Sequence, residues 1–403
     1  MSSEPRVRLK ESGGWTPWTL TREQAGTLSE SELVEIGTGP GDTWKLRARG
    51  AKGVVGAVRL GRGPAAVQLS IAPKIPIDRI LYLLGYAADH IRWSEEPVDG
   101  AARPDLLPAV GYAFARSAGR ALRPGALLGY RETEDTLPVL RGRLRSSAQL
   151  RRRPGLALPL EVVYDDHTTD IPENQLLLGA VRRLLRTPGL DPGCRTALHG
   201  LAGRLDGVVA PVPGAPLPRW APTRLNRRYQ QALGLAALIL NGDSYELDNG
   251  RLVRVDGMLM TMWRVYETFL GQALGEALRQ RAGGRAETRD TSYSLDVDRR
   301  HPLKPDLVHY LSGPAVVADA KYKPERERGD LYQMLAYCIR FGLKDGHLVY
   351  VSGVEDIVHV PVGEGIVRLH RHVLDLTLPH QDLQARIGVL ADTILSARSR
   401  ALL

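Results

Sequence analysis

Short apolar runs separated by glycines fill the first part of the chain, and apolar residues at helical spacing follow them. Residues 43–74 contain the runs TWKLRARG, VVGAVRLG and AAVQLSIAPK, which predict a small antiparallel meander. Residues 77–93 and 106–122 place apolar side chains three or four positions apart, as one face of an amphipathic helix requires. The pattern therefore predicts a β-rich head followed by helices.

The middle of the chain is less regular, and its most distinctive part is basic. Residues 131–160 form a segment that we expect to be partly exposed, and prolines make residues 208–222 an extended connector. The arginines of the basic segment could contact DNA or a protein partner, or form a solvated face. They are Arg141, Arg143, Arg145, Arg151, Arg152 and Arg153.

Two helices are predicted in this middle region. Residues 170–185 have Asp170 as a candidate N-cap and Pro172 in the first turn, where a proline is tolerated. A second helix is predicted over residues 223–241. The region is therefore expected to be mainly helical.

The last part of the chain alternates between helical and strand patterns, which indicates an α/β unit. The sequence as a whole predicts an α+β multidomain fold in three parts. These are a β-rich N-terminal module (1–95), a helical and basic middle region (96–245) and an α/β domain (246–403). Within the last part the predicted order is a helix over 258–281, strands over 291–297, 304–311 and 315–323, a helix over 329–341 and a strand over 346–352.

Composition restricts the class of protein. Hydrophobic residues make up 43% of the 403 positions and charged residues 25%, values typical of a folded globular chain. Only two cysteines occur, which excludes a disulfide framework and a four-cysteine zinc site. No apolar run is long enough to span a membrane, so we expect a cytoplasmic protein without a membrane partner. The net charge of +9 favours a polyanionic partner only weakly.

The segment KPDLVHYLSGPAVVADAKYK, residues 304–323, carries the candidate chemistry. Two β-prone runs flank a Ser-Gly-Pro turn, which predicts a hairpin. Asp319 and Lys321 are two positions apart and share one face of the second strand. Asp306 joins them if the hairpin pairs it with either residue, for example through a four-residue loop over 311–314.

Two carboxylates held close together repel one another and gain strongly from a shared divalent cation. We therefore expect Asp306 and Asp319 to bind Mg²⁺, with Mn²⁺ as a possible substitute and the carbonyl oxygen of Ala320 as a further ligand. Such a metal lowers the pKa of bound water, and Lys321 can orient that water or stabilise developing negative charge. This arrangement is typical of PD-(D/E)xK nucleases.

Three further residues are candidates for the same site. Glu267, on the helix before the hairpin, could reach the metal directly or through water, or could instead pair with Arg264. On the helix after the hairpin, Gln333 and Tyr337 are four positions apart and share a face, where they could hold a phosphate or the catalytic strand. Tyr337 could also be ordinary core packing, and Lys323 could be either a second phosphate contact or a solvated strand end.

Two other patterns carry less weight. The glycine-rich stretch GTGPGD at residues 37–42 is not followed by Lys and Ser or Thr, so it is not a nucleotide-binding P-loop. His370 and His372 share a strand face and could bind metal. Because no third ligand is near them in sequence, surface histidines are the favoured interpretation.

The chain resembles the McrC family, the nuclease subunits of McrBC-type restriction systems. The resemblance rests on the hairpin residues together with SIAPKIPIDRILYLLGYA, LPVLRGRL, YDDHTTDIPENQLLLGAVRRLL and RLNRRYQQALGLAALIL, and it extends over most of residues 70–350. It implies a C-terminal PD-(D/E)xK domain and an N-terminal module that docks on a hexameric McrB-like AAA+ GTPase and stimulates GTP hydrolysis. It also implies double-stranded DNA with modified cytosine as the substrate.

Two other functions remain open from the sequence. One is a self-sufficient DNA repair or processing nuclease with the same core. The other is a non-catalytic adaptor of an AAA+ partner, which the intact set Asp306, Asp319, Lys321 and Gln333 disfavours. No catalytic candidate precedes Glu267, so residues 1–245 are expected to serve partner binding.

Overall fold

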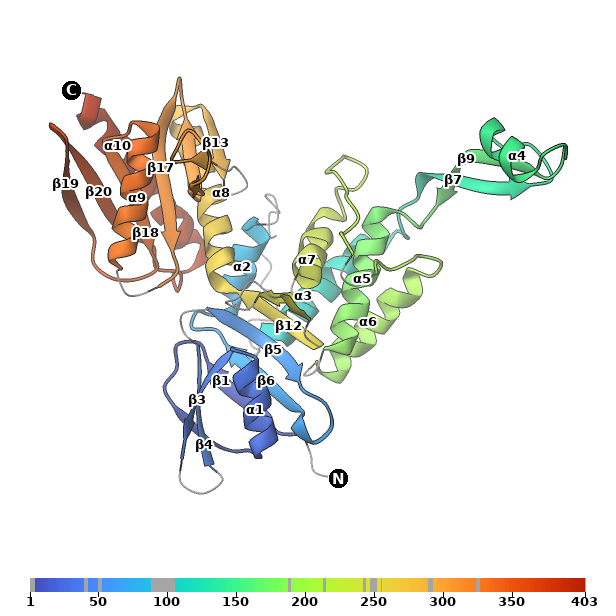
Figure 1. The fold of residues 1–403 in the computed structure, drawn as a ribbon, viewed down its shortest axis with the longest axis horizontal. Coiled ribbons are helices and arrows are strands. Elements are labelled where there is room, and N and C mark those ends of the chain that lie inside the picture. Colours follow the sequence, from blue (N-terminus) through green and yellow to red (C-terminus); the bar gives the residue numbers. More distant parts are fainter. Residues whose placement is uncertain are drawn as a thin grey trace. The chain divides into compact units, whose positions relative to one another are not determined.

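The computed structural model groups the two ends of the chain in one compact unit. Met1–Val110 and Ser244–Leu403 form this first unit, and Gly111–Asp243 form a second unit between them in sequence (Figure 1). The sequence predicted three successive parts, whereas in the structure the first and the last part belong to one compact unit. The structure describes residues 4–39, 43–49, 53–87, 106–187, 190–212, 215–241, 244–246, 252–254, 256–288, 293–323 and 327–402.

A few sequence predictions fall on residues outside this description. They concern residues 40–42 of the glycine-rich stretch, residues 88–93 of the first predicted helix and residues 291–292 of a predicted strand. Within the described part of the chain, no helix is long and apolar enough to cross a bilayer.

The N-terminal part of the first unit contains a four-stranded sheet that borrows a strand from much later in the chain. β5 and β6 form an antiparallel pair, β1 adds to β6 in parallel, and β12 pairs antiparallel with β5. The order is therefore β1-β6-β5-β12. The bounds are β1 Arg6–Lys10, β5 Val54–Leu60, β6 Val67–Ala72 and β12 Asp256–Thr261.

A three-stranded sheet, β2-β4-β3, packs on the same hydrophobic core. The predicted meander over 43–74 was therefore only partly right. β5 and β6 pair as expected, but β4 pairs with β2 and β3, so that Leu46 and Ala48 enter the shared core. The bounds are β2 Thr16–Thr19, α1 Arg22–Glu30, β3 Val34–Thr38, β4 Thr43–Ala48, the short 3-10 helix η2 Gly63–Ala65 and α2 Ile77–Ala87.

The second unit combines helices with a sheet that the sequence analysis missed. β7 and β9 form a long antiparallel pair, and β8 adds to β9. The basic segment 131–160 therefore lies in strands β7 and β8 and the short helix α4. The bounds are α3 Leu106–Ala121, β7 Gly129–Leu137, β8 Arg143–Leu144, α4 Ser146–Arg152, β9 Leu160–Thr168, α5 Pro172–Arg186, α6 Pro192–Arg204 and α7 Gln230–Asn241.

The predicted N-cap of α5 was wrong. Ile171 is the N-cap residue and makes no side-chain cap. The buried carboxylate of Asp170 instead accepts hydrogen bonds from the Val209 amide (2.9 Å) and from Gln175 (2.8 Å). It therefore anchors the proline-rich connector to the start of the helix. α7 begins at Gln230 and not at 223, because Asn226 accepts from the Thr223 amide (2.8 Å) in a local turn.

The C-terminal part of the first unit is built around a six-stranded mixed sheet in the order β13-β16-β17-β18-β20-β19 (Figure 1). The pairs β17–β18 and β18–β20 are parallel, and the others are antiparallel. The strand bounds are β13 Arg285–Thr288, β16 Leu307–Tyr310, β17 Pro314–Lys321, β18 Asp345–Tyr350, β19 Asp356–Val362 and β20 Gly365–Val373. The short pairs β10–β11 (Ser244–Glu246, Leu252–Arg254) and β14–β15 (Tyr293–Ser294, Pro302–Leu303) complete the unit.

Helices cover both faces of this sheet. α9 (Arg328–Phe341) packs on the face that carries Val308. α8 (Met262–Ala282) packs on the opposite face, where Leu307 lies beside Gly275, and α10 (His380–Leu402) packs against α8. A Cβ on Gly271 of α8 would lie 2.9 Å from the carbonyl oxygen of Asp306, so a glycine is needed for this close approach.

The helix predicted over 258–281 begins later than expected. Residues up to Thr261 belong to β12, and α8 starts at Met262. The cause is a distant segment of the chain, since β12 pairs with the edge of β5. Gly56 allows this pairing, since it has φ +128° and a Cβ there would lie 2.1 Å from the Met258 carbonyl oxygen.

Candidate active site

The hairpin β16–β17 brings the two predicted carboxylates together. Leu307 pairs with Ala318, so Asp306, one residue earlier, comes opposite Asp319. The Asp306 carboxylate accepts a hydrogen bond of 2.8 Å from the Ala320 amide of the neighbouring strand. The register thus brings Asp306 beside Asp319, one of the two arrangements that the sequence left open.

The loop of the hairpin is one residue shorter than the four-residue example given by the sequence. Tyr310 pairs with Pro314, and Leu311 donates a backbone hydrogen bond to Gly313. A register shift between His309 and Tyr310 compensates for this difference. Residues 307–309, which lie between the shift and the candidate site, thus keep the register that brings Asp306 beside Asp319.

Both carboxylates are buried, and their pKa values are raised. Burial, the negative charge of Asp319 and that of Glu267 together raise the pKa of Asp306 to about 9. Burial also raises the pKa of Asp319, although Lys321 opposes this. Because burial and mutual repulsion disfavour two negative charges here, a bound cation would stabilise the ionised pair.

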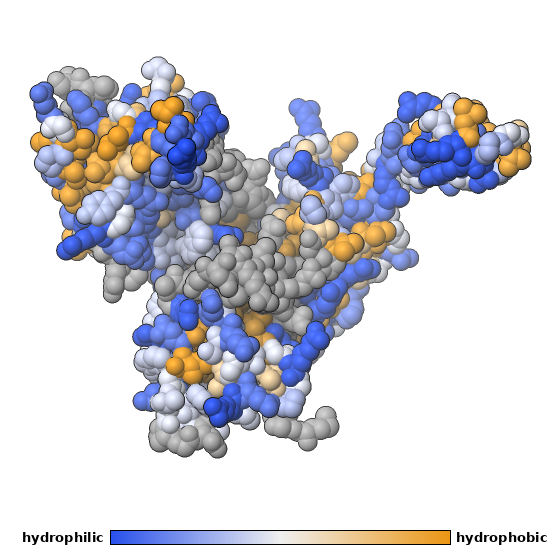
Figure 2. Space-filling model, viewed as in Figure 1, coloured by the Kyte–Doolittle hydropathy of each residue, from blue (hydrophilic) through white to orange (hydrophobic). Residues whose placement is uncertain are grey.

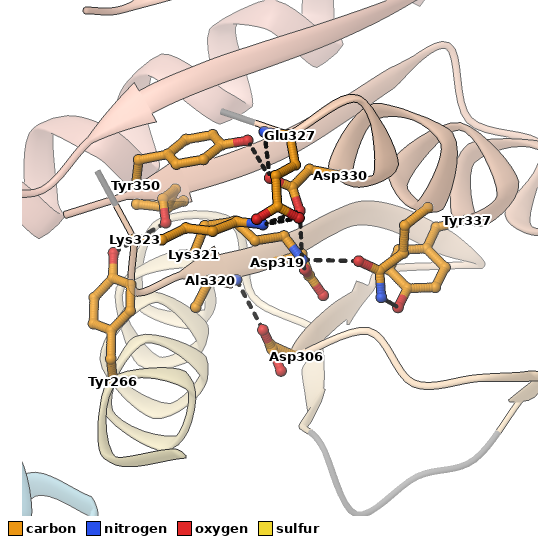
Figure 3. Close-up of polar contacts among 12 residues, drawn as sticks. Tyr266, Asp306, Asp319, Ala320, Lys321, Lys323, Glu327, Asp330, Tyr337 and Tyr350 are labelled. Atoms are coloured by element: carbon orange, nitrogen blue, oxygen red, sulfur yellow. Dashed lines mark hydrogen bonds and ion pairs between the residues drawn. The ribbon is translucent and has the colours of Figure 1, made fainter. Parts of the chain in front are cut away.

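Lys321 connects the carboxylates to helix α9. Its ammonium lies 2.5 Å from Asp319 and 3.6 Å from Asp330, and it donates a 2.8 Å hydrogen bond to the side-chain oxygen of Gln333 (Figure 3). Burial alone would lower the pKa of Lys321, but the nearby carboxylates raise it. The lysine is therefore a fixed positive charge at neutral pH.

Gln333 and Tyr337 take part in the same network. The Gln333 amide nitrogen donates a 2.8 Å hydrogen bond to the Tyr337 hydroxyl, while its oxygen accepts from Lys321. Tyr337 also lies in the hydrophobic core beneath α9, so packing and polar contact both hold it. The two residues thus position Lys321 from one turn of the helix.

Asp330 is a member of the site that the sequence analysis missed. Its buried carboxylate accepts a 2.9 Å hydrogen bond from the Tyr350 hydroxyl and lies 3.0 Å from the Lys323 ammonium. Lys323 also pairs with Glu327 at 2.9 Å, so it is a partly buried ion-pair residue and not a solvated strand end. The available signal was an acid in the first turn of the predicted helix, three residues before its glutamine.

Glu267 lies on α8, near the carboxylate pair. It is half-buried, and its negative charge contributes to the raised pKa of Asp306. The adjacent Tyr266 is fully buried and donates a 3.2 Å hydrogen bond to the Val349 carbonyl of β18. This bond fixes the turn of α8 that carries Glu267.

The candidate ligands near the hairpin all offer oxygen atoms, which suit a hard divalent cation. The side chains of Asp306, Asp319 and Glu267 and the carbonyl of Ala320 are all oxygen donors, the type that Mg²⁺ prefers. Their excess of negative charge over the single lysine favours a cation in the same way. The residues present therefore fit a magnesium or manganese ion.

The residue that follows β17 makes a contact with the N-terminal part of the unit. The hydroxyl of Tyr322, the residue after Lys321, donates a 3.1 Å hydrogen bond to the buried carboxylate of Glu11. Glu11 also accepts from the Lys74 amide at 3.1 Å, and the Lys74 ammonium lies 4.0 Å from the Tyr322 ring centroid. The strand that carries the site is thus tied to residues near the start of the chain.

The predicted surface position of His370 and His372 was wrong. Both side chains are buried, and His347 on the adjacent strand β18 lies with them. They are part of a separate cluster in the same sheet.

Comparison with known proteins assigns the family. A profile described as "McrBC 5-methylcytosine restriction system component" matches residues 50–351, well over half of the chain. The chain belongs to this family. No curated protein matches the sequence.

Solved structures similar to this chain come from McrBC complexes. McrC bound to the McrB AAA+ hexamers of Thermococcus gammatolerans is similar with a TM-score of 0.55 and 19% identity, covering 96% of this chain and 100% of that chain. A chain of the McrBC complex from the same organism gives 0.40 and 20% identity, covering 68% and 88%. The first similarity shows a common fold for this McrBC component.

Proposed function

We propose that this McrBC component is the DNA-cleaving subunit of its restriction complex, with a PD-(D/E)xK site. One observation carries the proposal: the hairpin brings the buried carboxylates of Asp306 and Asp319 together with the partly buried Lys321. Two buried carboxylates beside a lysine have no obvious structural benefit, because burial penalises each charge. Metal-assisted phosphodiester cleavage uses this combination directly.

Each residue has a defined task in such a reaction. A magnesium ion, when bound, neutralises charge at the phosphate and lowers the pKa of a water molecule. Asp306, Asp319 and the Ala320 carbonyl would hold the ion, and Glu267 would do so directly or through water. Lys321 orients the attacking water or stabilises the developing charge. Gln333 and Tyr337 keep the ammonium of Lys321 in place.

We further propose that the chain works with an McrB-like AAA+ GTPase hexamer on double-stranded DNA with modified cytosine. The support is the family description, which names 5-methylcytosine restriction, and the similarity to an McrC bound to McrB hexamers. In this division of labour the partner hydrolyses GTP and this chain cuts. Residues 1–245 supply the contacts that stimulate the partner.

The part of the second unit formed by β7, β8, α4 and β9 has a surface suited to a protein partner. Large apolar side chains are exposed there among polar ones (Figure 2). Such exposure favours a protein partner over the DNA backbone. The residues are Val139 (70% exposed), Leu140 (62%), Leu150 (71%), Leu156 (59%) and Leu158 (56%).

The arginines of this region are partly used within the unit itself. Arg145 pairs with Glu134 at 2.6 Å, and Arg152 and Arg153 both pair with Glu161. Arg141 pairs with Asp166 at 3.1 Å. Four of the six arginines therefore have carboxylate partners, which leaves less positive charge for phosphates than the sequence indicated.

The test is cleavage of plasmid DNA by the full-length chain with its AAA+ partner, GTP and Mg²⁺. Asp306→Asn is compared with Asp382→Asn, a matched change of an exposed acid on α10. We expect wild type and Asp382→Asn to cut plasmid that contains 5-methylcytosine. Asp306→Asn should lose at least about a hundredfold in rate while still stimulating GTP hydrolysis.

Three outcomes would contradict parts of the proposal. Near-normal cutting by Asp306→Asn would refute the site. GTPase stimulation without cleavage by the wild type under Mg²⁺ or Mn²⁺ would identify a non-catalytic adaptor. Efficient cleavage without the partner, irrespective of modification, would identify a self-sufficient nuclease.

A further inference from the structure

A second group of potential metal ligands lies on the strands next to the candidate active site. β18 and β20 are parallel, and their register places His347 beside His370, with His372 two positions further along β20, opposite Val349. Because side chains alternate, these three residues share one face of the sheet. Leu348 and Leu369 point to the other face, into the core under α9.

The three imidazoles are buried and close together. None is more than 7% exposed, and one ligand nitrogen from each lies within 4.8 Å of the other two. The Nδ1 of His347 and the Nε2 of His372 are 3.1 Å apart. In a tetrahedral zinc site with bonds of 2.0–2.1 Å, two ligand nitrogens are separated by about 3.3 Å. One pair already has about this spacing, and a ring nitrogen of His370 lies within 4.8 Å of both other ligand atoms.

One of the three histidines is hydrogen-bonded to a carboxylate. Asp345 lies 2.7 Å from the Nε2 of His370 and forms two 2.7 Å hydrogen bonds with Arg368. Histidines that bind metals usually give their second nitrogen to such a group, which fixes the ring and strengthens the ligand. The second layer of a metal site is therefore present in the sheet.

The protonation state of the cluster suits metal binding. Burial and the neighbouring His372 keep the pKa of His347 well below its usual value. Burial and His370 lower the pKa of His372 to about 4. At neutral pH both rings are uncharged, which is the form that binds metals.

We propose that His347, His370 and His372 form a second metal site, for a borderline transition-metal cation with Zn²⁺ as the first candidate. Imidazole nitrogens suit zinc, copper or nickel, whereas Mg²⁺ prefers oxygen. The two sites in this sheet thus select different metals. A cation bound here joins β18 to β20 and stabilises the sheet from a place where it contacts no DNA phosphate.

The experiment measures bound zinc in a chain whose carboxylate site has been removed. Asp306→Asn/Asp319→Asn protein is equilibrated with Zn²⁺, freed of excess metal and analysed for metal content. We expect one equivalent per chain. Adding His372→Gln should remove it, and adding His359→Gln, a change of an exposed histidine on β19, should leave it in place.

A second measurement tests the ligand type and the fold. Co²⁺ bound to three histidines gives visible absorption bands, which we expect in the double variant and in the His359→Gln variant but not after His372→Gln. Circular dichroism shows whether each variant is folded. Zinc should also raise the melting temperature of the double variant, but not that of its His372→Gln derivative.

The result that overturns the proposal is a folded double variant that binds no Zn²⁺ and shows no cobalt bands. The cluster would then be a chain of hydrogen-bonded neutral histidines. Retention of one equivalent after His372→Gln would equally refute it. Neither result depends on DNA cleavage, so the proposed function can fail or succeed independently.

Discussion

Two polar clusters lie at the six-stranded sheet, and burial shifts the pKa values of their members in opposite directions. The carboxylate cluster (Asp306, Asp319 and Glu267) has raised pKa values at its two aspartates, and the histidine cluster (His347, His370 and His372) has lowered ones at two of its rings. In each case burial disfavours the charged form. Two buried carboxylates repel one another when both are ionised, and a bound cation favours their ionised form. Buried histidines are neutral at physiological pH, and the neutral ring is already the form that binds a metal.

The largest expected difference between the clusters is in cleavage. Asp319→Asn or Lys321→Ala should lower the single-turnover rate on modified DNA at least about a hundredfold, since each removes charge at the reacting centre. His372→Gln should leave that rate within about threefold of the wild type, because it contacts no reacting group. Rapid-quench measurements with saturating partner give these rates.

Two results of this measurement would contradict the assignment of the clusters. A loss of a hundredfold in His372→Gln with the fold intact would place the histidine cluster in the reaction. Equal losses for all three variants would mean that the sheet, and not the site, was damaged.

A second difference should appear in the pH dependence of stability without metal. The pKa of Asp306 is raised from 3.8 to about 9, so its contribution to stability is present below pH 3.8 and is lost as the pH rises towards 9. In a chelating buffer, the melting temperature of the wild type should therefore fall over this range. Asp306→Asn should show a smaller fall, and added Mg²⁺ should oppose the fall in the wild type only.

Calorimetric scans at several pH values test this. If the melting temperatures of the wild type and of Asp306→Asn changed equally with pH, ionisation of Asp306 would not destabilise the fold. The comparison between acidic and imidazole clusters would then lose its electrostatic basis.

The smallest expected effect concerns Tyr322, the residue that follows β17. Tyr322→Phe removes one hydrogen bond to the buried Glu11 and should lower the free energy of unfolding by about 1–2 kcal/mol. Tyr332→Phe, a change at a hydroxyl-bearing side chain that is 70% exposed, is the matched control. Urea unfolding followed by tryptophan fluorescence measures both.

Agreement between the two tyrosine variants would contradict the structural importance of the contact with Glu11. A normal stability with a reduced cleavage rate in Tyr322→Phe would instead show that the contact positions Lys321.

The grouping of the candidate site residues was predictable because its signals are local. Asp319 and Lys321 share a face through strand alternation alone, and a short hairpin has few ways to place Asp306. The histidine cluster needed a parallel pairing between β18 and β20, which a sequence does not display. With one strand in view, His370 and His372 had no third ligand, and their burial could not be inferred.

The fold was predicted least well where distant segments complete one another. Residues 258–261 of β12 were assigned to a helix because they are continuous with α8, and only pairing with β5 makes them a strand. Asp330 was missed for a similar reason, since its partners Lys323 and Tyr350 come from two other elements. Local patterns predict elements, while pairing across the chain decides their ends.

The position of β12 has a consequence for the order in which the protein is made. Ribosomes release the chain from its N-terminus, so β1, β5 and β6 emerge before all of Gly111–Asp243, and their fourth strand, Asp256–Thr261, emerges after it. During that interval β5 has an open edge that can pair with other chains. A fragment of residues 1–245 would keep this open edge permanently, so a fragment made to bind the partner must also carry β12.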